Sequence, residues 1–327
     1  MDTHFLINIC KLIREVNFYL IVIEIMKRVL NAERFLLIGH ILSMAFGLAG
    51  IILVLPNPEF QAKLAEFEWG STIFGWSMAG GGVVYMLLAT VAIALYAYRT
   101  LGMWHCLGFM LPAISLSLGS ELLGTSTGFP FGHYRYLSGL GYKIAGLVPF
   151  TIPLSWFYLG FSAYIIALTG LKTLKIKDWL SQIGAIFFGS LCLTSWDFVL
   201  DPAMSQAPIP FWVWDQPGAF FGMPYQNFAG WMGTGTLFMT VAALLWKIKP
   251  YTLPRNDLKL PLAVYLANFA FAAILSLTAG FYIPVLLGFI LGIFPLITLY
   301  WMATNQSILD AEINELGAKP EPVLLSK

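Results

Sequence analysis

Long runs of apolar residues, separated by short polar or proline-containing segments, follow one another along most of the chain. Each run approaches the roughly 20 residues that an α-helix needs to cross a bilayer. The pattern predicts an all-α, polytopic membrane bundle of about eight transmembrane helices. The predicted spans cover residues 35–55, 73–98, 104–121, 143–171, 179–200, 228–247, 260–281 and 283–301. A tight turn must separate the last two; the alternative is one long kinked segment and an odd number of spans.

The composition supports the membrane class. Of the 327 residues, 58% are hydrophobic and 11% are charged, whereas a soluble domain is about a quarter charged. A soluble globular enzyme is therefore excluded. The net charge of +1 gives no reason to expect a nucleic acid or another strongly charged partner. The three cysteines and four histidines are scattered, so the sequence predicts no disulfide framework, no metal site and no haem.

The distribution of lysine and arginine predicts the orientation. Positive residues near span ends accumulate in cytoplasmic loops. With the N-terminus inside, only Lys63, Arg135 and Lys143 lie on the opposite, trans side, which leaves 15 of the 18 positive residues on the cytoplasmic side. We therefore expect both termini to be cytoplasmic. Several acids lie on or near the trans side, namely Glu59, Glu66, Glu68, Glu121, Asp201 and Asp215.

Three segments of the chain are expected to differ in role. Residues 1–33 form an N-terminal extension, whose apolar stretch at residues 18–29 is short and interrupted by charge. It is either an amphipathic helix on the membrane surface or the product of a mis-annotated start, with translation beginning at Met26; we favour the second interpretation. Residues 34–302 form the transmembrane catalytic domain, and residues 303–327 form a polar cytoplasmic tail.

Glycines recur at small-residue spacing in two predicted spans. Gly288 and Gly292 lie in the last span, and Gly80, Gly81 and Gly82 lie in the second. Small residues let helix backbones approach closely in lipid, so helix packing is the first interpretation. The alternative is a smooth groove for a flat, rigid ligand.

Asp197 and Asp201 carry the strongest chemical signal. They are four residues apart, so on a helix they share one face, and Pro202 is expected to end that helix at or just after Asp201. Burial, mutual repulsion and the negative end of the helix dipole would let the pair keep one proton at neutral pH. Such a proton suits a general acid. For Asp201 the alternative is an ordinary Asp-Pro turn.

A second group of polar residues lies on the trans side between the third and fourth spans. Glu121 closes the third span and is either catalytic or a rim carboxylate held by Arg135. The run from His133 to Tyr136 could orient water or a carboxylate, or anchor the chain at the membrane surface. Asp215, in the next trans loop, is expected to be solvated.

Aromatic residues cluster around these acids in the sequence. They are Trp156, Phe157, Tyr158, Trp196, Phe211, Trp212, Trp214, Phe220, Phe221, Tyr225, Phe228 and Trp231. They form either an interfacial aromatic belt or a wall of electron-rich faces that stabilises a cation. Pro149 and Pro153 are expected to break the fourth span near this level, where a broken helix could line a cavity.

With these residues assembled, the chain resembles the carotenoid biosynthesis membrane-protein family whose characterised type is the carotenoid hydratase, acting on γ-carotene in cyanobacteria and on bisanhydrobacterioruberin in haloarchaea. The resemblance covers most of the chain from the second span to the sixth. It rests on Gly119-Ser-Glu121, residues 124–132, Tyr134-Arg-Tyr136, residues 148–156, residues 196–202, Phe211-Trp-Val-Trp214 and residues 222–231.

The resemblance implies addition of water across the terminal double bond of an acyclic carotenoid end, such as that of γ-carotene or lycopene, to give a tertiary alcohol. The residues suggest that an aspartic acid protonates the alkene and that water captures the resulting cation. The expected catalytic residues are Asp197, Asp201, Glu121 and His133. The expected substrate-binding residues are Tyr134, Arg135, Tyr136, Trp156, Trp196, Trp212, Trp214, Asp215, Tyr225, Asn227 and Trp231. No cofactor is expected.

The expected partners are the carotenoid in the bilayer and a downstream carotenoid glycosyltransferase, in a plasma or thylakoid-type membrane. Two rival functions remain. A membrane prenyltransferase could bind magnesium through Asp-x-x-x-Asp, although no convincing second acidic pair accompanies Asp197 and Asp201. A carotenoid-binding or transport protein could use the same acids as a proton relay.

Overall fold

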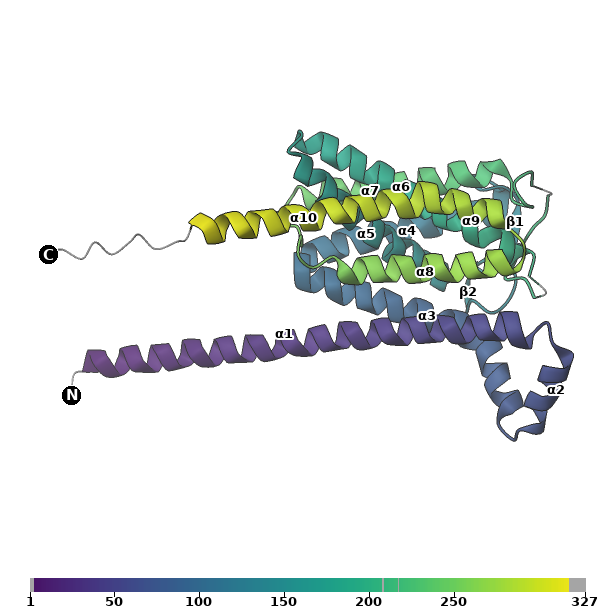
Figure 1. Ribbon diagram of the computed structural model, residues 1–327, viewed down its shortest axis with the longest axis horizontal. Helices are drawn as coiled ribbons and strands as arrows, with labels where there is room; N and C mark the ends of the chain where they lie inside the picture. The colour runs from purple at the N-terminus through teal and green to yellow at the C-terminus, as the bar shows by residue number, and fades with distance from the viewer. Residues whose placement is uncertain (1–2, 208, 217, 318–327) are drawn as a thin grey trace.

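The computed structural model describes residues 3–207, 209–216 and 218–317. Eight of its helical segments are long and apolar enough to cross a membrane, which confirms the prediction of a multi-pass, all-α membrane bundle. The helices run roughly parallel to one long axis, and the beginning of α1 and the end of α10 lie at the same end (Figure 1). We call the opposite end, which holds the connections that follow α1, α4, α6 and α8, the trans face.

The first span is part of a much longer helix. Helix α1 covers Thr3–Ala49 and continues as one π-helical turn, η1, over Gly50–Val54. Residues 3–33 are therefore helical and continuous with the span, and the position of the true start stays a prediction. The short helix α2 (Pro58–Glu66) follows at the trans face.

Helices α3 (Gly70–Leu101) and α4 (Met103–Thr127) are joined by a single residue. Gly102 has a φ of +83°, a conformation that glycine adopts without the steric cost of a Cβ atom. The chain therefore reverses between two antiparallel spans within one residue. Beyond α4, the chain forms the short strand β1 (Tyr134–Tyr136) at the trans face.

The fourth span is shorter than predicted. Residues Lys143–Ile144 (β2) and Val148–Pro149 (β3) form a small antiparallel hairpin, and helix α5 begins only at Thr151 and ends at Leu171. The predicted helix break at Pro149 and Pro153 was wrong. Pro149 lies in β3, and Pro153 lies in the first helical turn, where a missing N–H costs no intrahelical hydrogen bond.

Helix α5 lies at the centre of the bundle. It contacts α3, α4, α6, α7, α8 and α10, and all of its residues except Leu154 are buried. An all-round apolar helix is typical of such a central position. A 3₁₀ turn, η2 (Lys172–Leu174), leads from α5 to α6.

Helix α6 covers Asp178–Ser205 and contains Pro202, so the prediction that this proline ends the helix was wrong. Pro202 removes the N–H that would bond the carbonyl of Phe198, yet the helix continues for one more turn. The Ser205 hydroxyl donates a hydrogen bond to the Asp201 carbonyl at 2.7 Å, which stabilises that last turn. Strand β4 (Trp212–Trp214) and helix α7 (Tyr225–Trp246) follow.

The last two spans are separate, as predicted. Helix α8 (Lys259–Thr278) ends before a tight turn, in which Gly280 has a φ of +83°. The final span consists of α9 (Tyr282–Gly288), the π-helical turn η3 (Phe289–Ile293) and α10 (Phe294–Gly317). A Cβ atom at Gly288 would lie 2.1 Å from Val199, and one at Gly292 would lie 2.9 Å from Ser195. The packing interpretation of these two glycines is therefore confirmed.

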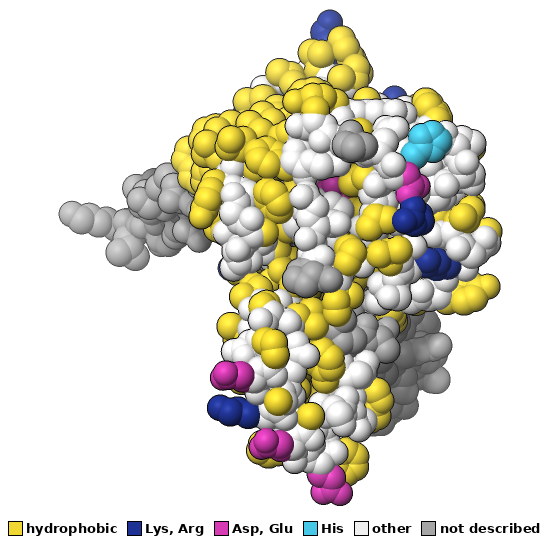
Figure 2. Space-filling model, turned by 90° about the vertical axis from the view of Figure 1, so that its right-hand side faces the viewer, with side chains coloured by type: hydrophobic (Ala, Val, Ile, Leu, Met, Phe, Trp, Pro, Cys, Tyr) yellow, Lys and Arg dark blue, Asp and Glu magenta, His cyan; other side chains and the backbone are white. Residues whose placement is uncertain are grey.

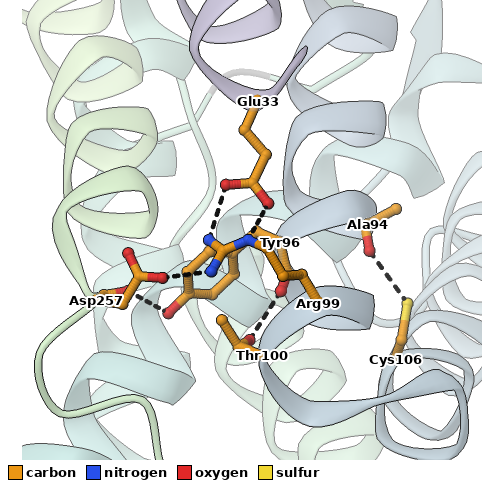
Figure 3. Close-up of polar contacts among 7 residues, drawn as sticks. All are labelled: Glu33, Ala94, Tyr96, Arg99, Thr100, Cys106 and Asp257. Atoms are coloured by element: carbon orange, nitrogen blue, oxygen red, sulfur yellow. Dashed lines mark hydrogen bonds and ion pairs between the residues drawn. The ribbon is translucent and has the colours of Figure 1, made fainter. Parts of the chain in front are cut away.

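A buried ion cluster joins α1 to the last turn of α3 (Figure 3). Arg99 binds both oxygens of Glu33, with Nε–Oε1 at 2.6 Å and Nη2–Oε2 at 2.8 Å, and its Nη1 lies 2.7 Å from Asp257 Oδ2. The Arg99 and Glu33 side chains are only 9% and 3% exposed. Tyr96 donates to the Asp257 carbonyl at 2.6 Å. We call these residues the Arg99 cluster.

Candidate active site

A cavity of about 50 Å³ lies inside the bundle near the trans face. Its lining includes the three candidate acids Glu121, Asp197 and Asp201, which come from α4 and α6. The cavity has room for one or two water molecules, and we call it the acid cavity. The cavity thus brings together three carboxylates from two helices.

Strands β1 and β4 cover the acid cavity. They pair antiparallel, with Tyr134 opposite Trp214 and Tyr136 opposite Trp212. Because side chains alternate between the two faces of a strand, these four aromatic residues point to the same face, and all four line the cavity. Arg135 lies on the other face and is exposed. We call the paired strands the lid.

Glu121 accepts hydrogen bonds on both of its oxygens. Oε2 accepts from the hydroxyls of Tyr134 and, at 2.9 Å, Tyr136, and Oε1 accepts from Trp156 Nε1 at 3.0 Å. Burial raises the pKa of Tyr134 and of Tyr136 well above the usual value of a tyrosine, and the charge of Glu121 is the second largest cause of the increase. Both hydroxyls therefore stay protonated and donate to the carboxylate.

Asp201 is bonded in a similar way by the other lid strand. Trp212 Nε1 donates to Oδ1, and Trp214 Nε1 donates to Oδ2 at 2.9 Å. An indole N–H can only donate, so these partners suit an ionised carboxylate. Asp201 is 2% exposed, and its two oxygens are both occupied.

Asp197 differs from the other two acids. Asn227 Nδ2 donates to its Oδ2 at 2.6 Å, whereas no described residue hydrogen-bonds to Oδ1. The residue is 4% exposed and lines the acid cavity. Asp197 is thus the acid of this site with an oxygen free to exchange a proton with a bound molecule.

Indole rings form much of the cavity wall. Trp156 stacks on Trp231 with ring centroids 3.9 Å apart and an interplanar angle of 18°. Trp196 lies edge-on to Trp231 at 5.9 Å, and Trp196 and Trp231 both line the cavity. Electron-rich faces at this position can stabilise a positive charge.

Five of the predicted site residues do not line the cavity, namely His133, Arg135, Trp156, Asp215 and Tyr225. His133, Arg135 and Tyr225 are exposed, and Arg135 forms an ion pair with Asp215 at the surface. The predicted alternative in which Arg135 holds Glu121 was therefore wrong, because Arg135 lies on the outer face of β1. Figure 2 shows the trans face, on which charged side chains are sparse.

Several residues of the cavity wall were not predicted from the sequence. Tyr85 and Met86 come from α3, Ser155 from α5 and Met204 from α6. Their signal is weak, because an isolated tyrosine or serine in an apolar run is ordinary. The lid was also missed, although Tyr-x-Tyr and Trp-x-Trp show the period of two that is typical of strands.

A buried polar network lies behind Tyr85. His40 Nδ1 is 2.8 Å from the Tyr85 carbonyl, and His40 Nε2 is 3.0 Å from Asn268 Nδ2. Tyr158 donates to Asn268 Oδ1 at 3.3 Å. If Asn268 donates to Nε2, then Nδ1 carries the hydrogen and donates to the carbonyl. The network joins α1, α3, α5 and α8 beside the site.

The described residues contain no group of three or more His, Cys, Asp or Glu side chains placed to hold a metal ion. Asp197 and Asp201 do line one cavity, but both oxygens of Asp201 are bonded to indole donors. A magnesium ion at Asp201 would have to displace at least one of them.

We expect the Tyr136→Phe variant to be less stable than the wild type by about 1–3 kcal/mol at neutral pH, because a buried hydrogen bond to a carboxylate is lost. The pKa of such a tyrosine is higher in the folded protein than in the unfolded protein. Its contribution to stability is therefore fully present below the unfolded-state pKa and is lost as the pH rises above that value. The difference should therefore shrink above about pH 10. Thermal unfolding in detergent from neutral pH upwards measures this; a difference that stays constant above about pH 10 would contradict the assignment.

Two comparisons with known proteins bear on this site. A family model described as carotenoid biosynthesis protein matches residues 81–295. Bisanhydrobacterioruberin hydratase of Haloarcula japonica is 36% identical over 140 residues, which are 42% of this chain and 44% of that protein. The alignment thus spans less than half of the relative. No solved structure matches this chain.

Proposed function

Because this chain belongs to the family of carotenoid biosynthesis proteins, we propose that it is a hydratase that adds water to the terminal double bond of an acyclic carotenoid end. The product is a tertiary alcohol. The relative from Haloarcula japonica is named a hydratase, which supports the reaction class. The proposed substrate end is of the lycopene or γ-carotene type.

One observation carries the proposal. Asp197 Oδ1 receives no hydrogen bond from any described residue, in a cavity where Asp201 and Glu121 accept hydrogen bonds on both of their oxygens. Donors on both oxygens favour the ionised form of a carboxylic acid. If one proton is shared among the three acids, the free oxygen of Asp197 is where it can reside and face a substrate.

The reaction then begins with proton transfer from Asp197 to the less substituted carbon of the double bond. The π electrons form the new C–H bond, and the other carbon becomes a tertiary cation. Trp196 and Trp231 line the cavity, and their electron-rich rings stabilise this charge. General acid catalysis of this kind contributes about a hundredfold to ten-thousandfold in rate.

Water completes the reaction. Its oxygen bonds to the cationic carbon, and its proton passes to a carboxylate, for which Asp201 and Glu121 are the candidates in the cavity. Transfer of that proton back to Asp197 restores the starting state, so the net change is the addition of one water molecule. Asn227, which binds Asp197, is better placed to orient the water than His133, which is exposed.

The tertiary hydroxyl of the product is an acceptor for a sugar. We therefore propose a carotenoid glycosyltransferase as a downstream partner, in the same plasma or thylakoid-type membrane. A carrier that only binds carotenoid, or a magnesium-dependent prenyltransferase, would produce no hydrated pigment.

Expression of the full chain in a host that accumulates lycopene tests the proposal. We expect a new pigment heavier by one water molecule, because hydration adds only the elements of water. Mass spectrometry of the extracted pigments measures this, with the empty vector as control. Unchanged pigments in cells with well-expressed protein, for both lycopene and γ-carotene, would contradict the proposed function.

A further inference from the structure

Three cavities lie in a row from the acid cavity to the surface of the bundle. A middle cavity of about 50 Å³ lies beside the acid cavity, and an outer groove of about 540 Å³ lies beside the middle cavity. The acid and middle cavities share the residues Tyr85, Leu140 and Met204. The middle cavity and the outer groove share Ser43, Ser77 and Gly81.

The outer groove lies between α1 and α3 on the side surface of the bundle. Leu42, Phe46 and Trp76 line it and are 63%, 54% and 71% exposed. No charged side chain lines the groove or the middle cavity. In a membrane protein, such an exposed apolar groove along two spans opens to the lipid.

Three of the four glycines that line the row leave space that no side chain fills, whereas a Cβ atom at the fourth, Gly82, would lie 2.8 Å from the Gly139 carbonyl oxygen. Atoms added as Cβ at Gly47 and Gly50 would meet nothing within 4 Å, and one at Gly81 would meet only Ser77 Oγ at 3.7 Å. Gly288, by contrast, is required by close packing. Close packing therefore does not explain Gly47, Gly50 and Gly81, which favours the groove interpretation for Gly81.

Tyr85 stands at the junction of the acid and middle cavities. It is 7% exposed, and its hydroxyl makes no hydrogen bond to any described residue. Because Tyr85 lines both cavities, this hydroxyl can pair with a polar group when the cavities are occupied, such as the attacking water or the new hydroxyl of a product.

We propose that the row of cavities between α1 and α3 is a lateral channel that binds the linear polyene of the substrate, with its end group at the acid cavity and its chain leading out into the bilayer. This inference rests on the proposed function for the identity of the occupant. A linear apolar chain fits an uncharged groove, and a carotenoid is supplied by the lipid rather than by water. The lid covers the cavity at the trans face, which leaves the side of the bundle as the route.

The channel must widen locally for the end group of the polyene to reach the acid cavity, because the acid and middle cavities are small. The junction contains Met204, whose flexible side chain adapts to different neighbours. Leu140 lies in the connection between β1 and β2 rather than in a helix. The residues that separate the two cavities thus include one adaptable side chain and one loop residue.

Two channel-filling variants test the proposal, Gly81→Leu on α3 and Gly47→Leu on α1. Gly233→Leu is the matched control, because Gly233 on α7 also has nothing within 4 Å of an added Cβ and lines none of the three cavities. The full-length proteins are purified from lycopene-accumulating cells, and the lycopene bound per protein is measured by absorbance. Hydrated pigment is measured in the same cells.

We expect the two channel variants to bind roughly tenfold less lycopene than the control. The polyene can enter the channel of these variants only if it displaces the added leucine or is packed too tightly against it. Equal binding by Gly81→Leu, Gly47→Leu and Gly233→Leu would overturn the channel. Normal binding by the wild type without any hydrated product, together with weak binding by the channel variants, would overturn the hydratase and support the channel. Absence of any carotenoid, whether lycopene or its hydrated product, from the wild-type protein would overturn the channel as well.

Discussion

The Asp197→Asn variant should hydrate lycopene at least about a thousandfold more slowly than the wild type, since an amide cannot supply the proton that a general acid contributes. The substitution preserves the shape of the side chain and keeps an oxygen that can accept from Asn227. Folding and pigment binding should therefore be retained. The rate of appearance of hydrated pigment, divided by the amount of purified protein, measures the effect.

Asp178→Asn is the matched control. Asp178 begins the same helix, at the opposite end from the acid cavity, and its side chain is 88% exposed. Its replacement should leave the rate nearly unchanged. Near-normal hydration by Asp197→Asn would transfer the acid role to Asp201 or Glu121, and the free oxygen of Asp197 would not mark the proton donor.

The Arg99→Met variant should lose about 3–5 kcal/mol of stability, the cost of leaving a buried charge without its partner. Glu33 is bound on both oxygens by Arg99 and is buried, so its charge would have no counter-ion. Methionine keeps much of the side-chain volume, which limits the loss of packing. Thermal or denaturant-induced unfolding of the protein in detergent measures the change in stability.

Arg135→Met removes an arginine from an ion pair that is exposed. The Arg135 and Asp215 side chains are 64% and 42% exposed, and such pairs contribute at most about 1 kcal/mol. The variant should be nearly as stable as the wild type. Similar losses of stability in Arg99→Met and Arg135→Met would contradict a special contribution of the Arg99 cluster to the stability of the fold.

The spans could be predicted from the sequence because each depends on a local property, the apolar content of about 20 successive residues. The tight turn between the last two spans, at Gly280, was predictable because it must separate two such apolar runs. The course of the chain between spans was not. Residues 143–149 are apolar enough to extend the fourth span, but they form β2 and β3. Local hydropathy does not distinguish a short buried strand from the first turns of a helix.

The candidate site was partly predictable. The three acids could be found because ionisable residues are rare in membrane spans. Their partners could not, because Tyr134 and Tyr136 reach Glu121 only when β1 pairs with β4, a contact between distant parts of the sequence. The same pairing turns Arg135 away from Glu121. Alternation within a strand therefore decided which residues of the His133–Tyr136 run enter the cavity.

The lid has a consequence for biogenesis. Strand β1 precedes α5, whereas β4 follows α6, so the two strands can meet only after both of these helices have entered the membrane. Until then Glu121 lacks its tyrosine donors, and Asp201 lacks its indole donors. The acid cavity therefore closes late in membrane insertion, and a nascent chain that ends before Trp214 holds the acids without the cover that keeps them from water.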